Sequence, residues 1–278
     1  MPELPEVVTI CRGIAPLIVG LTIEEVIVRE PRLRVLIPAS LSASLKDRQI
    51  LSVSRRAKYL LIHCSDDSAL LIHFGMSGTL RYLLEPVPFD RHDHVEIIFA
   101  QGSRLRFRDP RRFGAILLCS GNPLSHPWLA DLGPEPLSGN FNTGFLYARS
   151  RQRTLTIKSF LMEQRTVVGI GNIYASEALH ASGIAPWVPA GTISRRRYGR
   201  LVAAVRAVLQ HAIAAGGTTL RDFQNADGKP GYFSSELAVY GRAGEECRKC
   251  GEKIQVMRIG GRSSFYCPNC QTEKESGS

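Results

Sequence analysis

The first residues of the chain combine a nucleophile with two groups that could transfer protons. Removal of Met1, which a small second residue permits, would leave Pro2 as a chain terminus with a free secondary amine. Such an amine titrates near pH ~8, so part of it is neutral and can attack a sugar or carbonyl carbon to form a Schiff base. Glu3 and Glu6 lie beside it and suit acid–base work. The alternative is a frayed terminus without function, because most chain ends are poorly ordered.

Four of the seven cysteines have the spacing of ligands to one metal ion. They form the pattern Cys247-x2-Cys250-x16-Cys267-x2-Cys270. Each pair can chelate from one turn, and four thiolates make a closed tetrahedral zinc site that leaves no position for water. The pattern therefore predicts one structural Zn²⁺. A pair of disulfides is the weaker alternative, because the sequence has no secretory signal and we expect a cytoplasmic protein.

Two further segments could bind phosphate. Between the cysteine pairs, two short strands meeting at Gly260-Gly261 would place Arg262 at a hairpin tip, although a solvated surface arginine is the alternative. Earlier, Lys158 precedes the turn Gly171-Asn172 that joins two expected helices. Main-chain N–H groups at such a turn and at a helix N-terminus bind anions, so this segment predicts a phosphate clamp. Here the alternative is an ordinary helix–turn–helix hairpin.

Bulky residues among glycines mark a third kind of chemistry. Met76 and Phe113 each stand in a glycine-containing segment at the end of an expected strand, and Arg111 lies close to Phe113 in the sequence. Exposed apolar residues beside an arginine can insert into a base stack, but both could instead pack in a core. Lys58, at a strand boundary, is a candidate active-site cation or simply a solvated lysine.

The charge balance is consistent with a polyanionic partner. The net charge is +10, and no apolar run is long enough to span a membrane at ~18 residues. Clusters of basic residues in separate segments favour a folded groove that follows a phosphate backbone. The clusters are Arg104, Arg106, Arg108, Arg111 and Arg112, and further along Arg149, Arg151, Arg153 and Lys158.

The elements that must position these residues indicate a multidomain α+β protein. Val7, Ile10 and Ile14 recur at helical spacing near the N-terminus, and six β-rich segments between about 22 and 118 suggest an antiparallel sandwich or barrel. Helices are expected at Leu155–Glu163 and Ile173–Ala181, and again before Gly216-Gly217. We predict an N-terminal helix with a β-sandwich at 1–133, a helical domain at 134–240, a zinc-ribbon hairpin at 241–273 and a tail at 274–278.

Taken together, the chain from Pro2 to Cys270 resembles the formamidopyrimidine-DNA glycosylases, bacterial enzymes that remove oxidised purines. Leu4 resembles this branch, whereas the sister endonuclease VIII branch usually has glycine there. Thr218–Phe233 resembles the loop that covers the flipped purine in this family. The motifs that carry the resemblance are Pro2-Glu-Leu-Pro-Glu-Val, Arg56-Ala-Lys58, His73-Phe-Gly-Met-Ser-Gly, Asp109-Pro-Arg-Arg-Phe-Gly, Gly169-Ile-Gly-Asn-Ile-Tyr-Ala-Ser-Glu177 and the four cysteines.

The resemblance implies a role for each matching residue. Pro2 would attack C1′ of the damaged nucleotide, Glu3 would shuttle protons, and Glu6 would order the site. Lys58 would bind the phosphate beside the lesion and assist β-elimination, and Arg262 would assist δ-elimination. Neither a catalytic metal nor an organic cofactor is implied. The fold implied includes a helix-two-turns-helix motif, and the partner is double-stranded DNA with a flipped base, bound by a monomer.

The remaining roles concern DNA binding. Met76, Arg111 and Phe113 would fill the gap left by the extruded nucleotide, with Arg111 facing the orphaned cytosine. The positions that would contact DNA also include His92, Arg153, Lys158 and Asn172. Arg153 stands where lysine is common, a change that a phosphate contact survives. Val8 stands where the family usually has glutamate, which puts the local packing in doubt more than the activity.

Three other functions compete with this interpretation. A pyrimidine-directed glycosylase is disfavoured by Leu4 and by the Thr218–Phe233 loop. A non-catalytic zinc-ribbon protein that recognises bent or damaged duplex DNA would have no need of the set Pro2, Glu3, Lys58 and Arg262. An RNA-binding module is disfavoured because no aromatic stacking platform is evident in the sequence.

Overall fold

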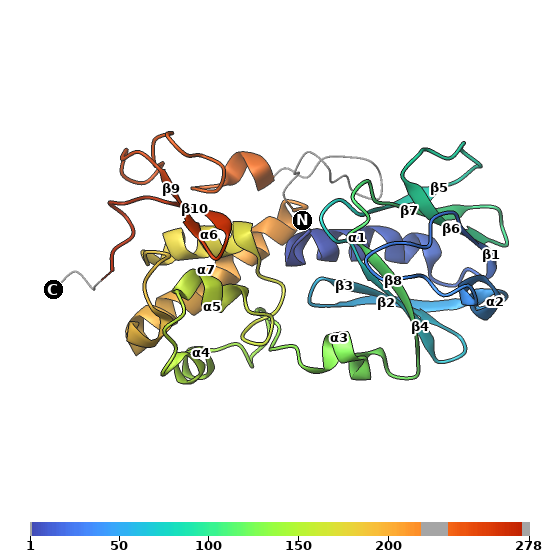
Figure 1. Cartoon of the computed structure of the whole chain (residues 1–278), viewed down its shortest axis with the longest axis horizontal. Helices are drawn as coiled ribbons and strands as arrows, with labels where there is room; N and C mark the ends of the chain where they lie inside the picture. Colours follow the sequence, from blue (N-terminus) through green and yellow to red (C-terminus); the bar gives the residue numbers. More distant parts are fainter. Residues whose placement is uncertain (1, 218–232, 274–278) are drawn as a thin grey trace. The chain divides into compact units, whose positions relative to one another are not determined.

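The computed structural model of the chain describes residues 2–217 and 233–273 (Figure 1). It divides into two compact units. The first comprises the chain up to Ala130 and a short segment that starts at Ala215, and the second comprises Asp131–Ala214 and the chain from Ser235 onward. The expected loop Thr218–Phe233 lies outside the described residues apart from its last residue, and the predicted domain boundaries stay a prediction.

The first unit begins with the helix α1, Leu4–Ile18. Pro5 occupies the first turn, where its missing N–H costs nothing. Val7, Ile10 and Ile14 are at most 1% exposed, so the predicted apolar face is confirmed as the buried one. The N-terminal end of the helix is held by a capping box between Glu3 and Glu6. A capping box satisfies N–H groups that the first turn leaves without helical partners.

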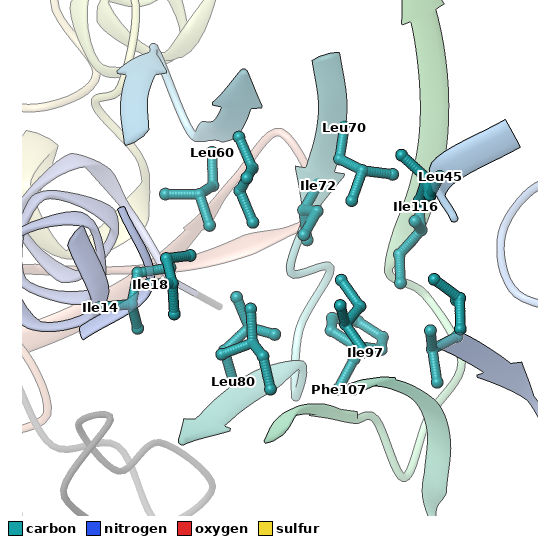
Figure 2. Packing of buried hydrophobic residues seen from close by; sticks show 14 of the residues in the cluster. Ile14, Ile18, Leu45, Leu60, Leu70, Ile72, Leu80, Ile97, Phe107 and Ile116 are labelled. Carbon is teal, nitrogen blue, oxygen red and sulfur yellow. The ribbon is translucent and has the colours of Figure 1, made fainter. Parts of the chain in front are cut away.

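Two four-stranded antiparallel sheets follow, with the strand orders β1-β6-β7-β5 and β2-β3-β4-β8. Figure 2 shows that the core lies between their facing residues, with Ile72 and Ile116 of one sheet close to Ile97 and Phe107 of the other, and with Ile14 of α1. The strands are β1 Ile23–Val28, β2 Ile50–Arg56, β3 Tyr59–Cys64, β4 Ser68–His73, β5 Thr79–Leu83, β6 Asp93–Phe99, β7 Arg104–Arg108 and β8 Ala115–Ser120. Short helices complete the unit: α2 Leu41–Leu45, η1 Pro123–Ser125 and α3 Pro127–Ala130.

The six expected strands are confirmed, whereas β5 and β7 were not predicted. The sequence of β7, Arg-Leu-Arg-Phe-Arg, alternates charged and apolar residues as a strand does. Its three arginines were instead interpreted as a basic cluster. Leu105 and Phe107 are each 1% exposed and face the core. The strand tolerates three arginines because they pair with carboxylates, among them Glu96 on the neighbouring strand β6.

The second unit is helical and carries a two-stranded hairpin. Gly183, with φ of +70°, ends α6 in the left-handed conformation of a glycine C-terminal cap. The helix α4, which polar residues obscure in the sequence, was not predicted. The elements are α4 Thr143–Ser150, α5 Ile157–Met162, α6 Asn172–Ser182, η2 Ala190–Thr192, α7 Arg195–Ala214, η3 Phe233–Glu236, β9 Gln255–Ile259 and β10 Arg262–Tyr266. None of the described helices combines the length and hydrophobicity that a membrane crossing requires.

Candidate active site and nucleic-acid interface

The N-terminal segment is fixed rather than frayed. Pro2 is buried, and Glu3 and Glu6 are each 2% exposed. The main-chain N–H of Glu3 donates a 2.8 Å hydrogen bond to Oε2 of Glu6, which fixes the backbone one residue after Pro2. Two carboxylates therefore lie within a few residues of the proline, in a buried setting that suits proton transfer. The alternative of a disordered terminus does not hold for the described residues.

Lys58 is not a solvated surface lysine, because it is only 7% exposed. It follows the end of β2, where Ala57 has a left-handed φ of +55° and accepts a hydrogen bond from the Arg55 guanidinium at 3.2 Å. Its charge acts on His73, whose pKa is lowered to about 4 by burial first, then by Arg34 and Lys58. His73 is therefore neutral at physiological pH.

Met76 and Phe113 are exposed, so the core-packing alternative is wrong for both. Their exposed fractions are 40% and 48%. The two loops that carry them touch through their backbones, because a Cβ at Gly75 would lie 2.3 Å from the carbonyl carbon of Phe113. The Arg111 guanidinium lies 5.0 Å from the Phe113 ring centroid, in cation–π contact. We call Met76, Arg111 and Phe113 the wedge residues.

A buried carboxylate that the sequence analysis did not single out holds these loops together. Asp109 is 0% exposed, accepts the Ser77 hydroxyl at 2.6 Å and accepts the Gly114 N–H at 2.7 Å. Ser77 follows Met76, and Gly114 follows Phe113. One side chain thus positions both wedge loops. Its signal in the sequence is an aspartate before a proline at a strand end, a usual turn former with an acceptor side chain.

His73 contributes to the same arrangement from the end of β4. Its Nδ1 accepts the Gly75 N–H at 3.1 Å, which requires an unprotonated nitrogen. Because Gly75 lies against Phe113, the protonation state of His73 bears on the geometry of the wedge residues. The ring of His73 packs against that of Tyr59, with the centroids 5.0 Å apart.

The basic cluster on β7 is largely neutralised by protein carboxylates, which corrects the expectation of a phosphate-binding groove there. Arg106 is 2% exposed and pairs with Glu96 at 2.6 Å and with Asp93 at 3.2 Å. Arg104 also pairs with Glu96, at 3.0 Å, and Arg108 pairs with Asp90. Alternate residues of a strand point to one face, so the three arginines meet carboxylates of β6 and of the segment before it on that face. The cations left at the surface of this segment are Arg111 and Arg112.

His92 lines a polar hollow of about 360 Å³. Arg29, Arg91 and Arg112 also line it, together with the carboxylates of Glu30 and Asp93. Arg112 contacts Glu30 at 3.2 Å. Cations outnumber carboxylates in the hollow, so it suits an anion beside the wedge residues.

The four predicted cysteines come together as one cluster, with all sulfur atoms within 4.8 Å of one another. The Sγ atoms of Cys247 and Cys270 are 3.8 Å apart, and those of Cys250 and Cys267 are 3.4 Å apart. Sulfurs on a tetrahedron around Zn²⁺ at ~2.3 Å are separated by ~3.8 Å, so the donor set fits zinc. The Glu252 main-chain N–H lowers the pKa of Cys250 to about 6, whereas burial raises the pKa of Cys267. A cation is therefore needed to hold four thiolates together.

The helix α6 is the support for this zinc module. Nε2 of His180 lies 3.5 Å from the Cys247 sulfur. One turn earlier, the Glu177 carboxylate accepts the N–H groups of Val239 and Tyr240 at 2.9 and 2.8 Å, and that of Ala238 at 2.8 Å. Glu177 ends the motif that begins at Gly169, and its position in the sequence alone assigns it no role. It anchors the segment that leads into the cysteine pairs.

The zinc hairpin is docked by two residues that were predicted to contact DNA. Lys158 is 1% exposed, and its ammonium group donates to the Ser263 carbonyl at 3.1 Å and to the Ser264 hydroxyl at 2.7 Å. Asn172 donates to the same Ser263 carbonyl at 3.0 Å. The observed partners of Lys158 are thus protein atoms, and its phosphate contact stays a prediction. Arg262, the residue before Ser263, is exposed at the tip.

The hairpin turn at the tip lies at Gly260-Gly261, as predicted. Gly260 and Gly261 have φ of +56° and +75°, which a two-residue hairpin turn requires and which only glycine adopts easily. Arg262 opens β10 opposite Ile259. Arg153, the other predicted phosphate ligand of this unit, pairs with Glu163 at 2.5 Å and keeps 41% of its side chain exposed.

Family models match three parts of the chain. The formamidopyrimidine-DNA glycosylase N-terminal domain matches residues 1–116, and the H2TH domain of the same glycosylase matches residues 132–224. A zinc finger found in FPG and IleRS matches residues 244–272. The three models together cover most of the chain.

Whole-chain relatives agree with these matches. A formamidopyrimidine-DNA glycosylase of Syntrophotalea carbinolica is 54% identical over 98% of this chain and 100% of its own length. A mutant of the Lactococcus lactis protein, crystallised with DNA containing Fapy-dG, has a TM-score of 0.92 at 34% identity and covers 98% of this chain and 100% of its own. The Lactococcus lactis protein with DNA containing an abasic site has a TM-score of 0.90 at 34% identity, covering 97% and 99%.

Proposed function

The chain belongs to the formamidopyrimidine-DNA glycosylase family, and from this membership we propose that it is a base excision repair enzyme. It removes oxidised purines, such as 8-oxoguanine and formamidopyrimidines, from duplex DNA and then cleaves the abasic strand. The observation that carries the proposal is the fixed N-terminus, in which Pro2, Glu3 and Glu6 are buried together in a chain 54% identical to a named glycosylase.

Access to the damaged base requires extrusion of the nucleotide. C1′ cannot be attacked inside a duplex, and flipping costs roughly a few kcal/mol of stacking and pairing. The exposed wedge residues Met76 and Phe113 replace the lost stacking. The guanidinium of Arg111, beside the Phe113 ring, offers donors to the orphaned base, which the resemblance suggests is cytosine.

The proposed chemistry uses the amine of Pro2 once Met1 has been removed. The amine nitrogen forms a bond to C1′, the glycosidic bond breaks, and Glu3 delivers a proton that assists base release and ring opening. The resulting iminium accepts electrons and makes the 2′-hydrogen acidic. Loss of that proton expels the 3′-phosphate by β-elimination, and a second elimination expels the 5′-phosphate. Glu6 keeps the Glu3 backbone in place through its 2.8 Å hydrogen bond.

Cations then bind the phosphates that the eliminations release. Lys58, 7% exposed at the end of β2, serves the phosphate next to the lesion and β-elimination. Arg262, exposed on the zinc hairpin, serves δ-elimination. His92, Arg153 and Asn172 are proposed to contact the DNA backbone. Zinc has a structural role, because four sulfur ligands close its coordination shell. We expect a monomer that acts in the cytoplasm, without a catalytic metal or organic cofactor.

Borohydride trapping on a duplex with 8-oxoguanine opposite cytosine tests the proposal. Reduction of the iminium should yield a covalent complex, and mass spectrometry should place the cross-link on Pro2. A variant extended at its N-terminus, which blocks the amine, should bind the same duplex but give no cross-link. A cross-link formed only with an oxidised pyrimidine would indicate the sister activity. Tight binding without any cross-link would indicate a non-catalytic damage-binding protein.

A further inference from the structure

Gly217, which follows the end of α7 in the sequence, lies against the carboxylate of Glu6. A Cβ added at Gly217 would lie 3.1 Å from Oε1 and 3.3 Å from Cγ of Glu6. Gly217 also has a φ of +84°, a conformation that side chains other than glycine's disfavour. Oε2 of Glu6 accepts the Glu3 N–H, whereas Oε1 lies beside Gly217.

We propose that Gly217 is a positioning residue for the catalytic N-terminus and acts through Glu6, an inference that rests on the proposed function. Oε2 of Glu6 holds the Glu3 N–H at 2.8 Å, one residue after Pro2. Oε1 lies on the side of Gly217 where a Cβ would stand, and Gly217 can approach it this closely because it has no side chain. Glu6 is 2% exposed, and its carboxylate lies between the Glu3 N–H and Gly217.

Gly217 is therefore connected to Pro2 through two contacts, one with the Glu6 carboxylate and one from that carboxylate to the Glu3 N–H. A methyl group at position 217 would have to displace the Glu6 carboxylate by a few tenths of an ångström, because 3.1 Å is shorter than an ordinary carbon–oxygen contact. The Glu3 N–H would follow the carboxylate or lose its acceptor. Either change moves the backbone beside Pro2, and small displacements at a reacting centre reduce rates strongly.

The neighbouring Gly216 provides a matched control. Its φ is +77°, so alanine there is strained in the same way, but among the described residues an added Cβ would meet no heavy atom within 4 Å. Gly217→Ala and Gly216→Ala therefore share the backbone strain and differ in the contact with Glu6. Any difference between the two variants reports that contact.

The experiment compares single-turnover base release, borohydride trapping and affinity for a non-cleavable abasic analogue in both variants. We expect G217A to release base and form the cross-link about tenfold more slowly than G216A, since a 1 Å misplacement costs about a hundredfold. Affinity for the analogue should agree within about twofold between them, because ground-state contacts to DNA are not altered. Equal rates for G217A and G216A, with an active wild type, would overturn the positioning role. An inactive wild type would instead reject the proposed function.

A stability measurement keeps the inference testable if G217A folds poorly. The melting temperatures of G217A and G216A are compared again in a Glu6→Ala background, which removes the carboxylate. If the contact is responsible, the difference between the two alanine variants should disappear there. A difference that persists without the carboxylate would overturn the inference.

Discussion

Lys158 on α5 and Ser263 on β10 are joined by a 3.1 Å hydrogen bond, although 105 residues separate them in the sequence. The bond fixes the zinc hairpin to the helical part of its own unit directly beside Arg262. Asn172 donates a second hydrogen bond to the same Ser263 carbonyl, at 3.0 Å. A lysine that sequence motifs place at the DNA thus serves the hairpin that presents the proposed δ-elimination residue.

Replacing Lys158 with Met should lower the stability of the hairpin, and the loss of folding free energy should exceed the loss of DNA-binding free energy. The change keeps the aliphatic stem but removes the donor to Ser263 and Ser264, at a cost of about 1–3 kcal/mol for buried polar groups left unpaired. Thermal unfolding should show the loss, and the ratio of δ- to β-elimination products should fall several-fold.

Ser264→Ala is the control for this change, because it removes the hydroxyl partner of Lys158 and no positive charge. It should reproduce part of the stability loss and leave the salt dependence of DNA binding unchanged. A K158M variant of full stability, with weaker DNA binding and a shallower salt dependence, would show that Lys158 contacts phosphate instead.

Replacing Asp109 with Ala should disorder the wedge residues. The buried Gly114 N–H and Ser77 hydroxyl would lose their acceptor, which costs about 2–4 kcal/mol. Fluorescence of 2-aminopurine beside the lesion should show slower nucleotide extrusion, and urea unfolding should show the stability loss. The Asp109 carboxylate accepts three hydrogen bonds, from Ser77, Arg111 and Gly114; Ser77→Ala removes one of them and should have the smaller effect on both measurements. Equal effects of the two variants would argue against Asp109 as the shared anchor.

Acid should destabilise the first unit through His73. Its pKa in the folded protein is about 4, well below the ordinary value of about 6.5, so the unfolded chain binds the proton more readily between these values. Stability should therefore be full above pH ~6.5 and fall by at most about 3 kcal/mol as the pH drops to ~4. Urea unfolding at pH 7, 5.5 and 4.5 measures this slope.

His73→Asn is the matched variant, because an amide oxygen can accept the Gly75 N–H in place of Nδ1 without titrating. It should reduce the slope of stability against pH in this window. An unchanged slope in H73N would assign the acid sensitivity to other groups.

Removal of zinc should unfold the hairpin and abolish strand cleavage. Cys247→Ser should lower the zinc content below one ion per chain, reduce the melting temperature and weaken DNA binding, because the module has only a small core of its own. Cys11→Ser is the control, since Cys11 lies on α1 and outside the cluster. Full zinc content in C247S by metal analysis would contradict the assigned ligand set.

The sequence alone determined those features that depend on local order. Cysteine spacing predicted the metal cluster, because each pair chelates from one turn. The helical period of Val7 and Ile10 predicted α1, and Gly260-Gly261 predicted the hairpin turn that presents Arg262. The motifs around Pro2, Lys58, Met76, Phe113 and Asn172, taken together with the four cysteines, indicated the family. In each case the signal lies within a few consecutive residues.

Only the tertiary structure decided which charged groups face protein and which face solvent. Arg106 looked like part of a basic surface, yet it is buried between Glu96 and Asp93 of a neighbouring strand. Lys158 stays a predicted phosphate ligand, but its hydrogen bond to a carbonyl 105 residues later in the chain could not be read from the sequence. Burial of a charge is tolerable only where long-range packing supplies its partner, and no local pattern encodes that partner. For the same reason, Asp109 and Gly217 became visible only when distant loops were brought into contact.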